Sequence, residues 1–187
     1  MTDLDIKQWT FKILLLGDMA VGKTSLINRY IEHSFSFDYL PTLGVNIISK
    51  DIEIEQIGSL IRLIFWDIAG QDKYEKCRQA YYEGCAGALL VYDLTRDDTF
   101  MNIESKWLED LQKNIRKKCD FLLIGNKVDL KDNRVVSYEE SEKLAKNINA
   151  IDFLETSALN GENVESAFLK LVYQILKQYR VDFEINL

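Results

Sequence analysis

The run from Gly17 to Thr24 constrains the fold of this chain more than any other stretch. It reads GDMAVGKT and fits the pattern G-x-x-x-x-G-K followed by Ser or Thr, in which backbone N–H groups and a lysine cradle a polyphosphate. An apolar run, residues 11–16, precedes it, and a segment of helical period, residues 23–32, follows it. Strand, loop and helix therefore stand in the order that a phosphate-binding loop requires, although a turn with a solvated lysine would also fit these eight residues.

The residues of this loop have separate predicted tasks. We expect Lys23 to reach the terminal phosphates and Thr24 to hold Mg²⁺, because that hard cation takes oxygen ligands. Backbone groups around the loop and the start of the helix complete the predicted contacts to the nucleotide. They belong to Asp18, Met19, Ala20, Val21, Gly22 and Ser25.

The composition is that of one globular domain. Of the 187 residues, 47% are apolar and 28% are charged, and no segment looks like a linker. The net charge is −7, with acidic residues spread along the chain. Nucleic acid would require a basic stripe, so we expect no nucleic-acid partner.

The cysteines and the two ends of the chain favour a cytoplasmic protein. Cys77, Cys85 and Cys119 are odd in number and lack metal-ligand spacing, so we expect reduced thiols. The sequence has no signal peptide, no run of bilayer-spanning length and no cysteine in its last seven residues to prenylate. We therefore expect no direct membrane anchor in this chain.

Apolar runs alternate with segments of helical period, which is typical of an α/β fold with a mostly parallel sheet covered on both faces. Residues on either side of Gly58 and Ser59 alternate between apolar and polar, which predicts a hairpin with one strand at the sheet edge. The expected strands are residues 11–16, 44–55, 60–67, 86–93, 120–126 and 151–155. The expected helices are residues 23–32, 73–83, 99–116, 138–149 and 162–180.

Two of these helices carry further local signals. Apolar residues from Phe100 to Ile115 recur at spacings of three and four, which predicts a stripe packed against the core. Ser137 and Glu140 form a capping box at the start of the fourth helix.

A second polar site follows the strand that ends at Asp67, in the run FWDIAGQ. A carboxylate there can hold Mg²⁺ through water, Gly70 can offer its N–H to a γ-phosphate, and Gln71 can orient an attacking water. Without the phosphate-binding loop, a polar turn after a buried strand would explain the same residues.

Two further runs concern the base. In NKVD, the carboxylate of Asp129 can accept from the N1–H and the exocyclic amine of guanine, a pair of donors that adenine cannot present. In TSAL, the N–H of Ala158 could donate to guanine O6. An ordinary loop turn would also hold an Asn and an Asp. The predicted base-binding residues of the two runs are Asn126, Lys127, Asp129, Ser157, Ala158 and Leu159.

Together these residues resemble the Ras-superfamily small GTPases over roughly residues 11–180. The runs WDIAGQ, AYYEG and GALLVYD look most like the Rab branch. The resemblance implies a P-loop NTPase G-domain, with a six-stranded, mostly parallel sheet, one antiparallel edge strand and five helices. It divides the chain into an extension at 1–10, the G-domain at 11–180 and a short tail at 181–187.

The resemblance also implies a switch that binds GTP or GDP with Mg²⁺ and hydrolyses GTP slowly, in membrane trafficking or related signalling. On this likeness Phe35 would stack on the guanine edge and Tyr39 would close over the phosphates. Thr42 would bind the γ-phosphate and would share Mg²⁺ with Thr24 and Asp67. Gln71 would be the catalytic residue.

Partner proteins would bind through two switches, residues 33–44 and 68–82. Effectors, exchange factors and GTPase-activating proteins are the classes that the resemblance implies. Ile47, Trp66 and Tyr81 stand where Rab proteins expose an aromatic triad to effectors. Because Ile47 replaces the usual Phe, a buried strand aliphatic is an equally good interpretation of it.

Three departures from the family pattern leave alternatives open. Met19 fills a position that is Gly in Ras and commonly Ser in Rab, and its side chain approaches the space of Gln71 and the attacking water. Met19, together with Ile68 in place of the usual Thr, raises the alternative of an interaction scaffold that binds guanine nucleotide but scarcely hydrolyses it. An ATP-dependent P-loop enzyme would need adenine tolerated at Asp129. The absent prenylation cysteine leaves peripheral membrane association to partners or to a tail missing from this chain.

Overall fold

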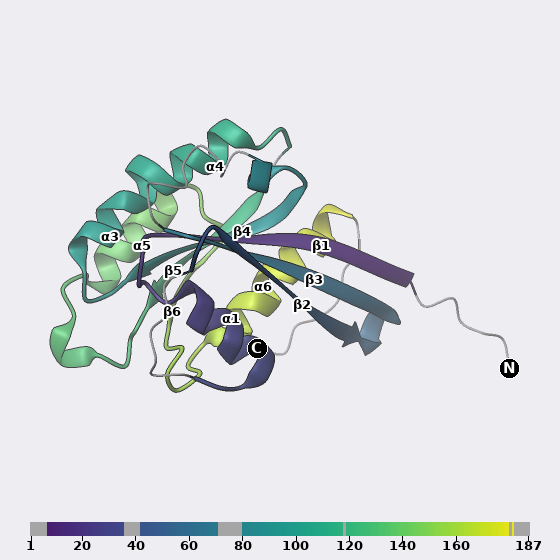
Figure 1. The fold of residues 1–187 in the computed structure, drawn as a ribbon, viewed down its shortest axis with the longest axis horizontal. Coiled ribbons are helices and arrows are strands. Elements are labelled where there is room, and N and C mark those ends of the chain that lie inside the picture. Colours follow the sequence, from purple (N-terminus) through teal and green to yellow (C-terminus); the bar gives the residue numbers. More distant parts are fainter. Residues whose placement is uncertain (1–6, 36–41, 71–79, 118, 180, 182–187) are drawn as a thin grey trace, which may run out of the picture.

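The computed structural model describes residues 7–35, 42–70, 80–117, 119–179 and 181, and these ranges hold one six-stranded sheet. Its strands lie in the order β2-β3-β1-β4-β5-β6 (Figure 1). All neighbouring pairs are parallel except β2 and β3, so the predicted mostly parallel sheet with one antiparallel edge strand is confirmed. The strands are β1 (Lys7–Leu16), β2 (Val45–Ile54), β3 (Ser59–Ile68), β4 (Cys85–Asp93), β5 (Asp120–Asn126) and β6 (Phe153–Thr156).

Helices cover both faces of this sheet. Figure 1 shows α1 and α6 on one face and α3, α4 and α5 on the other. The α-helices are α1 (Lys23–Glu32), α3 (Asp97–Asn102), α4 (Glu109–Asn114), α5 (Tyr138–Asn147) and α6 (Val164–Gln178). Residues 80–82 are also helical, while residues 71–79, most of the helix expected near 73–83, lie outside the described residues. Shorter elements are the 3₁₀ turns η1 (Glu55–Ile57) and η4 (Lys131–Asn133) and the π-helical segment η3 (Ile103–Leu108).

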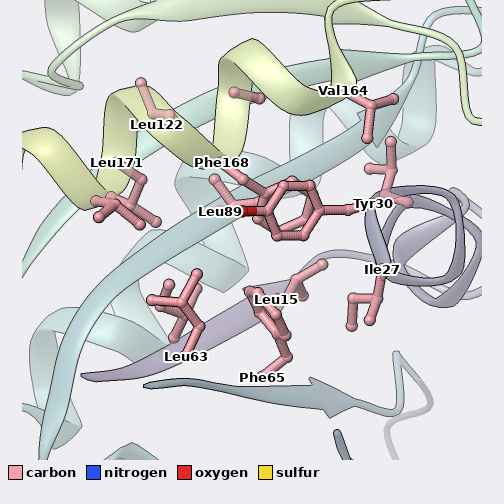
Figure 2. Packing of buried hydrophobic residues seen from close by; sticks show 14 of the residues in the cluster. Leu15, Ile27, Tyr30, Leu63, Phe65, Leu89, Leu122, Val164, Phe168 and Leu171 are labelled. Atoms are coloured by element: carbon pink, nitrogen blue, oxygen red, sulfur yellow. The ribbon is translucent and has the colours of Figure 1, made fainter. Parts of the chain in front are cut away.

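Two apolar clusters fill the space between the helices and the sheet. Under α1 and α6, the rings of Tyr30 and Phe168 stack with centroids 4.2 Å apart, and Phe65 meets Phe168 edge-on at 5.2 Å (Figure 2). On the other face, Tyr92 and Trp107 are fully buried. Because both faces are covered, β4 and β5 are buried over most of their length, as their continuous apolar sequence predicts.

The helical segment at 97–114 differs in shape from the single α-helix expected over 99–116. It begins as α3, changes to the π-helical η3 at Ile103 and returns to an α-helix at Glu109. A π turn holds more residues per turn than an α-helix, and such turns often occur at functional sites. Spacings of three and four predicted which side chains are buried, but they carry no information about this change of pitch.

The local signals at the other elements agree with the structure. The side chain of Ser137 accepts from the N–H of Glu140 at 3.2 Å, and the Glu140 carboxylate accepts from the N–H of Ser137 at 2.9 Å, so the capping box is confirmed. Gly58, at φ 55°, closes the turn between η1 and β3. Within the described ranges, no helix combines the length and the apolar character needed to cross a bilayer.

Candidate nucleotide-binding site

The predicted binding runs come together at one edge of the sheet, where β1, β3, β5 and β6 end. The loop that follows β1, residues Gly17–Thr24, is called the phosphate loop below. Strand order brings the ends of β3 and β4 to either side of β1, and the ends of β5 and β6 follow beyond β4. Open α/β sheets bind ligands at this edge, outside the carboxyl ends of their strands.

The phosphate loop folds around the ammonium group of Lys23. The Lys23 Nζ donates to the carbonyls of Gly17 at 2.7 Å and Asp18 at 2.8 Å, and the side chain is buried. Ala20 and Gly22 take positive φ angles of 63° and 100°, which bend the loop before α1 begins at Lys23. The ammonium is therefore held inside the loop, at the helix N-terminus where an anion is favoured.

Two glycines leave room that no other residue could leave. A Cβ on Gly22 would lie 2.2 Å from Nδ2 of Asn126, and a Cβ on Gly70 would lie 2.4 Å from the backbone of Asp18 and Met19. The chain after β3 thus touches the phosphate loop directly. Gly70, predicted to serve a γ-phosphate, lies beside Met19.

Three oxygen-bearing side chains predicted to hold Mg²⁺ lie together. The hydroxyl of Thr24 donates to Oδ2 of Asp67 and lies 3.1 Å from the hydroxyl of Thr42. The hydroxyl of Thr42 donates to the same Oδ2 of Asp67 at 3.3 Å. Asp67 is fully buried, and its Oδ1 has no hydrogen-bond partner among the described residues.

These residues fit a magnesium ion. A buried carboxylate oxygen without a partner is costly unless a cation or a donor satisfies it. One carboxylate and two hydroxyls suit Mg²⁺, which binds few protein oxygens and keeps phosphate and water ligands. No larger group of His, Cys, Asp or Glu able to hold a metal gathers in the part of the chain that the structure describes.

Asn126 joins the end of β5 to the phosphate loop and to the loop after β6. Its Nδ2 donates to the carbonyl of Val21 at 2.9 Å, and its Oδ1 accepts from the hydroxyl of Thr156 at 3.2 Å and the N–H of Ala158 at 3.3 Å. Asn126 is buried, so this amide fixes three loops relative to one another. The residues predicted to bind the base and those predicted to bind the phosphates therefore lie at one site.

The side chain predicted to read guanine is also held in place. The hydroxyl of Ser157 donates to Oδ1 of Asp129, which leaves acceptor capacity on the carboxylate. Asp129 is half-buried, Ala158 is buried, and Leu159 is exposed. The carboxylate and the Ala158 N–H lie in adjacent loops, as recognition of one base by both would require.

Comparison of the sequence with known proteins shows the family to which this chain belongs. The sequence profile of the Ras family matches residues 12–177. Ras-related protein RABA4b of Arabidopsis thaliana is 44% identical over 167 residues, which cover 89% of this chain and 73% of that protein. Ras-related protein RABA1g of the same plant is 40% identical over 177 residues, covering 95% and 78%. Ras-related protein YPTC6 of Chlamydomonas reinhardtii is 38% identical over 185 residues, covering 97% and 84%. The chain belongs to the Ras family.

It is a Rab-like small GTPase, and its fold is that of a P-loop GTPase. The described parts of the two segments predicted as switches touch each other, since the N–H of Ala69 donates to the carbonyl of Gly44 at 2.9 Å. Phe35 is half-buried and packs against the core cluster under α1 and α6. Tyr39 and Gln71 lie outside the described residues, so the roles predicted for them stay predictions.

The side chains predicted to meet effectors lie on β2, on β3 and at residue 81. Ile47 of the GTPase is 51% exposed, so its interpretation as a buried strand aliphatic is wrong. It pairs in register with Trp66, and the rings of Trp66 and Tyr81 lie 5.8 Å apart. The ammonium of Lys12 sits 3.6 Å above the Trp66 ring. These residues form one surface, while its use by effectors stays a prediction.

The sequence did not reveal two residues that hold the base-binding loops of this GTPase. Asp93, at the end of β4, is buried and pairs with Lys127, with Asp93 Oδ2 2.7 Å from Lys127 Nζ. Arg29 on α1 donates to the carbonyls of Ala158, at 2.8 Å, and Leu159. The available signal for Asp93 was its position at the end of an apolar run of strand length, because Asp67 and Asn126 follow such runs in the same way.

The helical layer of α3 and η3 holds the other side of the phosphate loop. The Asp18 carboxylate accepts from Asn102 Nδ2 at 2.6 Å and from Trp107 Nε1 at 2.9 Å. Arg96 donates to the carbonyl of Met19 at 2.9 Å and pairs with Asp98, whose carboxyl pKa it holds below the usual range. Asp18, predicted for the nucleotide, therefore directs its side chain to the protein, so a contact to the phosphates would have to come from its backbone N–H.

Proposed function

We propose that this GTPase binds GTP and GDP with Mg²⁺, hydrolyses GTP slowly, and acts as a two-state switch in membrane trafficking. The observation that carries the proposal is the buried, unpartnered Oδ1 of Asp67 beside the hydroxyls of Thr24 and Thr42. A cation would satisfy this oxygen, and the phosphate loop would place a nucleotide at the same edge of the sheet. Mg²⁺ bound there would neutralise charge on the β- and γ-phosphates.

The protein groups divide the work of binding. Lys23 and the backbone from Asp18 to Ser25 hold the phosphates, and Thr24 and Thr42 supply hydroxyl oxygens beside Asp67. Gly70 would offer its N–H to the γ-phosphate, and its close approach to the phosphate loop supports this because a Cβ there would lie 2.4 Å from that backbone. Gln71, the next residue, orients the attacking water in this proposal.

Base selection follows from hydrogen-bond chemistry. Asp129 accepts from the two guanine donors, and Ala158 donates to O6 once its N–H turns from Asn126. Each such bond to a charged group contributes roughly 1.5–3 kcal/mol, so two of them favour guanine over adenine by about a hundredfold or more.

The decisive experiment identifies the nucleotide that co-purifies with the chain and follows its conversion over time. We expect GDP or GTP, with single-turnover conversion of GTP that stops when EDTA removes Mg²⁺. GTP should compete for the site at least a hundredfold better than ATP. A preference for ATP would contradict the assignment of Asp129 and Ala158.

A second candidate function is a guanine-nucleotide-locked interaction scaffold with little hydrolysis. The 47% exposed side chain of Met19 favours it, because it stands at the phosphate loop next to the chain that leads to Gln71. Turnover with and without Gln71→Leu separates the two. A switch loses most of its hydrolysis in this variant, whereas a scaffold shows no loss.

In this proposal the partners are effectors, exchange factors and GTPase-activating proteins that bind residues 33–44 and 68–82. Nucleic acid is not among them, given the acidic net charge of −7. The proposed location is the cytoplasm, with peripheral membrane association through partner proteins. Fractionation of cells that express this chain would test this, and tight membrane association without partners would contradict it.

A further inference from the structure

The strongest unassigned chemistry lies at the opposite edge of the sheet from the nucleotide site. Cys85 begins β4 and Cys119 precedes the first residue of the neighbouring β5, and both are free thiols. Their Sγ atoms lie 2.9 Å apart. A disulfide bond is about 2.05 Å long, so the two sulfurs need to approach by only about 0.9 Å.

Backbone pairing explains why the two side chains meet. Gly87 of β4 pairs with Asp120 of β5, so Cys85 and Cys119 lie just before a parallel pair of strands. Neighbouring strands lie about 4.8 Å apart, and disulfides most often join Cα atoms about 5.5–6 Å apart. The two cysteines are 34 residues apart in sequence, and the sheet, not their spacing, brings them together.

The two thiols have different surroundings. Cys119 is only 6% exposed, and burial together with the neighbouring Cys85 raises the pKa of its thiol. Cys85 is half-buried and lies opposite Lys12 on β1. The Lys12 ammonium donates to the carbonyl of Glu83 at 2.8 Å and interacts electrostatically with Cys85. Cys85 is the more exposed of the two thiols, so a small disulfide reaches it first.

We propose that Cys85 and Cys119 are a redox modification site that forms a reversible intramolecular disulfide by exchange with a low-molecular-weight disulfide such as oxidised glutathione. In the first step the Cys85 thiolate attacks one sulfur of the reagent. A mixed disulfide forms, the reagent's S–S bond breaks, and the released thiolate takes a proton from water.

In the second step Cys119 loses its proton to solvent and its sulfur attacks Cys85 Sγ. The mixed disulfide breaks, the internal disulfide forms, and the second small thiolate is released and protonated. The two protein thiols lose two electrons together, and one reagent disulfide is reduced to two thiols. Cys85 is thus the attacking thiol and Cys119 the resolving thiol.

The proposed disulfide would close a loop that contains the segment supporting the phosphate loop. It runs from the start of β4 through α3, η3 and α4 to the start of β5, and so contains Arg96 and Trp107. Cross-linking its two ends restricts the unfolded chain and should raise the thermal unfolding temperature. The bond lies at the far end of β4 from the nucleotide, so we expect no change in GDP affinity.

The test incubates the GDP-bound full chain in glutathione buffers of defined ratio, followed by acid quenching, alkylation and mass spectrometry. We expect the intact mass, measured before alkylation, to fall by two hydrogen atoms. We also expect a peptide cross-linked between residues 85 and 119, and a rise in unfolding temperature that a thiol reductant reverses. Cys77→Ser is the matched control and should give the same cross-link. Glutathione adducts without this cross-link, or a cross-link to Cys77, would overturn the proposal.

Two single variants test the order of attack. Cys119→Ser should stop at a glutathione adduct on Cys85. Cys85→Ser should form no cross-link, and its Cys119 should form a glutathione adduct more slowly than Cys85 does in the wild type. Faster modification of Cys119 than of Cys85 would overturn the assignment of roles.

Discussion

The indole Nε1 of Trp107 donates a hydrogen bond of 2.9 Å to Oδ1 of Asp18, across 89 residues of sequence. Trp107 lies in the π-helical η3 and is fully buried, and Asp18 is the second residue of the phosphate loop. Asn102 donates to the other carboxylate oxygen of Asp18. The core of one helical layer therefore fixes the backbone that would hold the phosphates.

We predict that Trp107→Phe destabilises the protein and speeds release of GDP. A hydrogen bond to a charged, buried acceptor contributes about 1.5–3 kcal/mol, and the smaller ring adds a cavity. Denaturant unfolding of the GDP-bound form and dissociation of a fluorescent GDP would measure the two effects.

Trp9→Phe is the matched control for this variant. The Nε1 of Trp9 is buried without a hydrogen-bond partner among the described residues, so that substitution removes volume but no hydrogen bond. A double-mutant cycle with Asp18→Ala, which removes the acceptor, should give a coupling energy of about 1–3 kcal/mol. Additive effects would show that Trp107 acts on the phosphate loop through packing alone.

We predict that Asp93→Asn weakens the binding of GDP through Lys127. The variant removes the ion pair of 2.7 Å between Asp93 and Lys127. The Asn side chain keeps an oxygen in the place of Asp93 Oδ1, which accepts from the N–H and the hydroxyl of Thr95. The Lys127 side chain is about a third exposed, so we expect a loss of about 1 kcal/mol, or roughly fivefold in affinity.

Titration with labelled GDP would measure this loss. Asp98→Asn serves as the control, since it breaks a surface ion pair with Arg96 and should change affinity by less than about 0.5 kcal/mol. Lys127→Met and the double variant complete the cycle. If Asp93→Asn lowers affinity as much in the Lys127→Met background, Asp93 does not act through Lys127.

Prediction from sequence was strongest where a local pattern determines the structure. The run before Gly17, the alternation around Gly58 and the apolar stretch from Gly87 to Asp93 each define a strand, and all three are confirmed. The capping box of Ser137 and Glu140 is confirmed for the same reason, because its two hydrogen bonds span three residues.

The sequence could not predict contacts that depend on strand order. Asp93 meets Lys127 because β4 and β5 are neighbours and Asp93 pairs with Asn126 in register, which no periodicity encodes. Cys85 and Cys119 meet for the same reason at the other end of the same strands. Trp107, which donates to Asp18, lies in a π turn, and the spacing of apolar residues looks the same with or without that turn.

We predict that stability falls in mild acid partly through Glu140. Hydrogen bonds from the Ser137 hydroxyl and N–H hold the pKa of the Glu140 carboxyl below its ordinary value of 4.5. A lowered folded-state pKa means that this contribution is complete above about pH 4.5 and is lost as the pH falls through the lower value.

Thermal unfolding across this pH range would measure that contribution. Glu140→Gln should be less stable than the wild type at pH 7, and the difference should shrink in acid. Glu139→Gln, one residue earlier in the first turn of α5, is the control. An equal pH slope in Glu140→Gln and the wild type would show that the capping carboxylate does not contribute.

We predict that Met19→Gly speeds GTP hydrolysis, both intrinsic and activator-stimulated, with little change in nucleotide affinity. The backbone of Met19 is fixed on one side by Arg96, which donates to its carbonyl at 2.9 Å. On the other side it lies so close to Gly70 that a Cβ there would be 2.4 Å from the Met19 nitrogen. The side chain projects from this fixed point, 47% exposed, beside the residue that precedes Gln71. It therefore competes for the space that the water and an incoming arginine finger need.

Single-turnover hydrolysis of the GTP-loaded proteins, with and without an activating protein, would measure this effect. Met19→Ala also removes the long side chain without the added backbone freedom of glycine, so it should speed hydrolysis as well. Met19→Leu conserves the volume and should stay as slow as the wild type. If all four proteins hydrolyse GTP at the same rate, the side chain does not obstruct the reaction, and the steric basis of the scaffold alternative disappears with it.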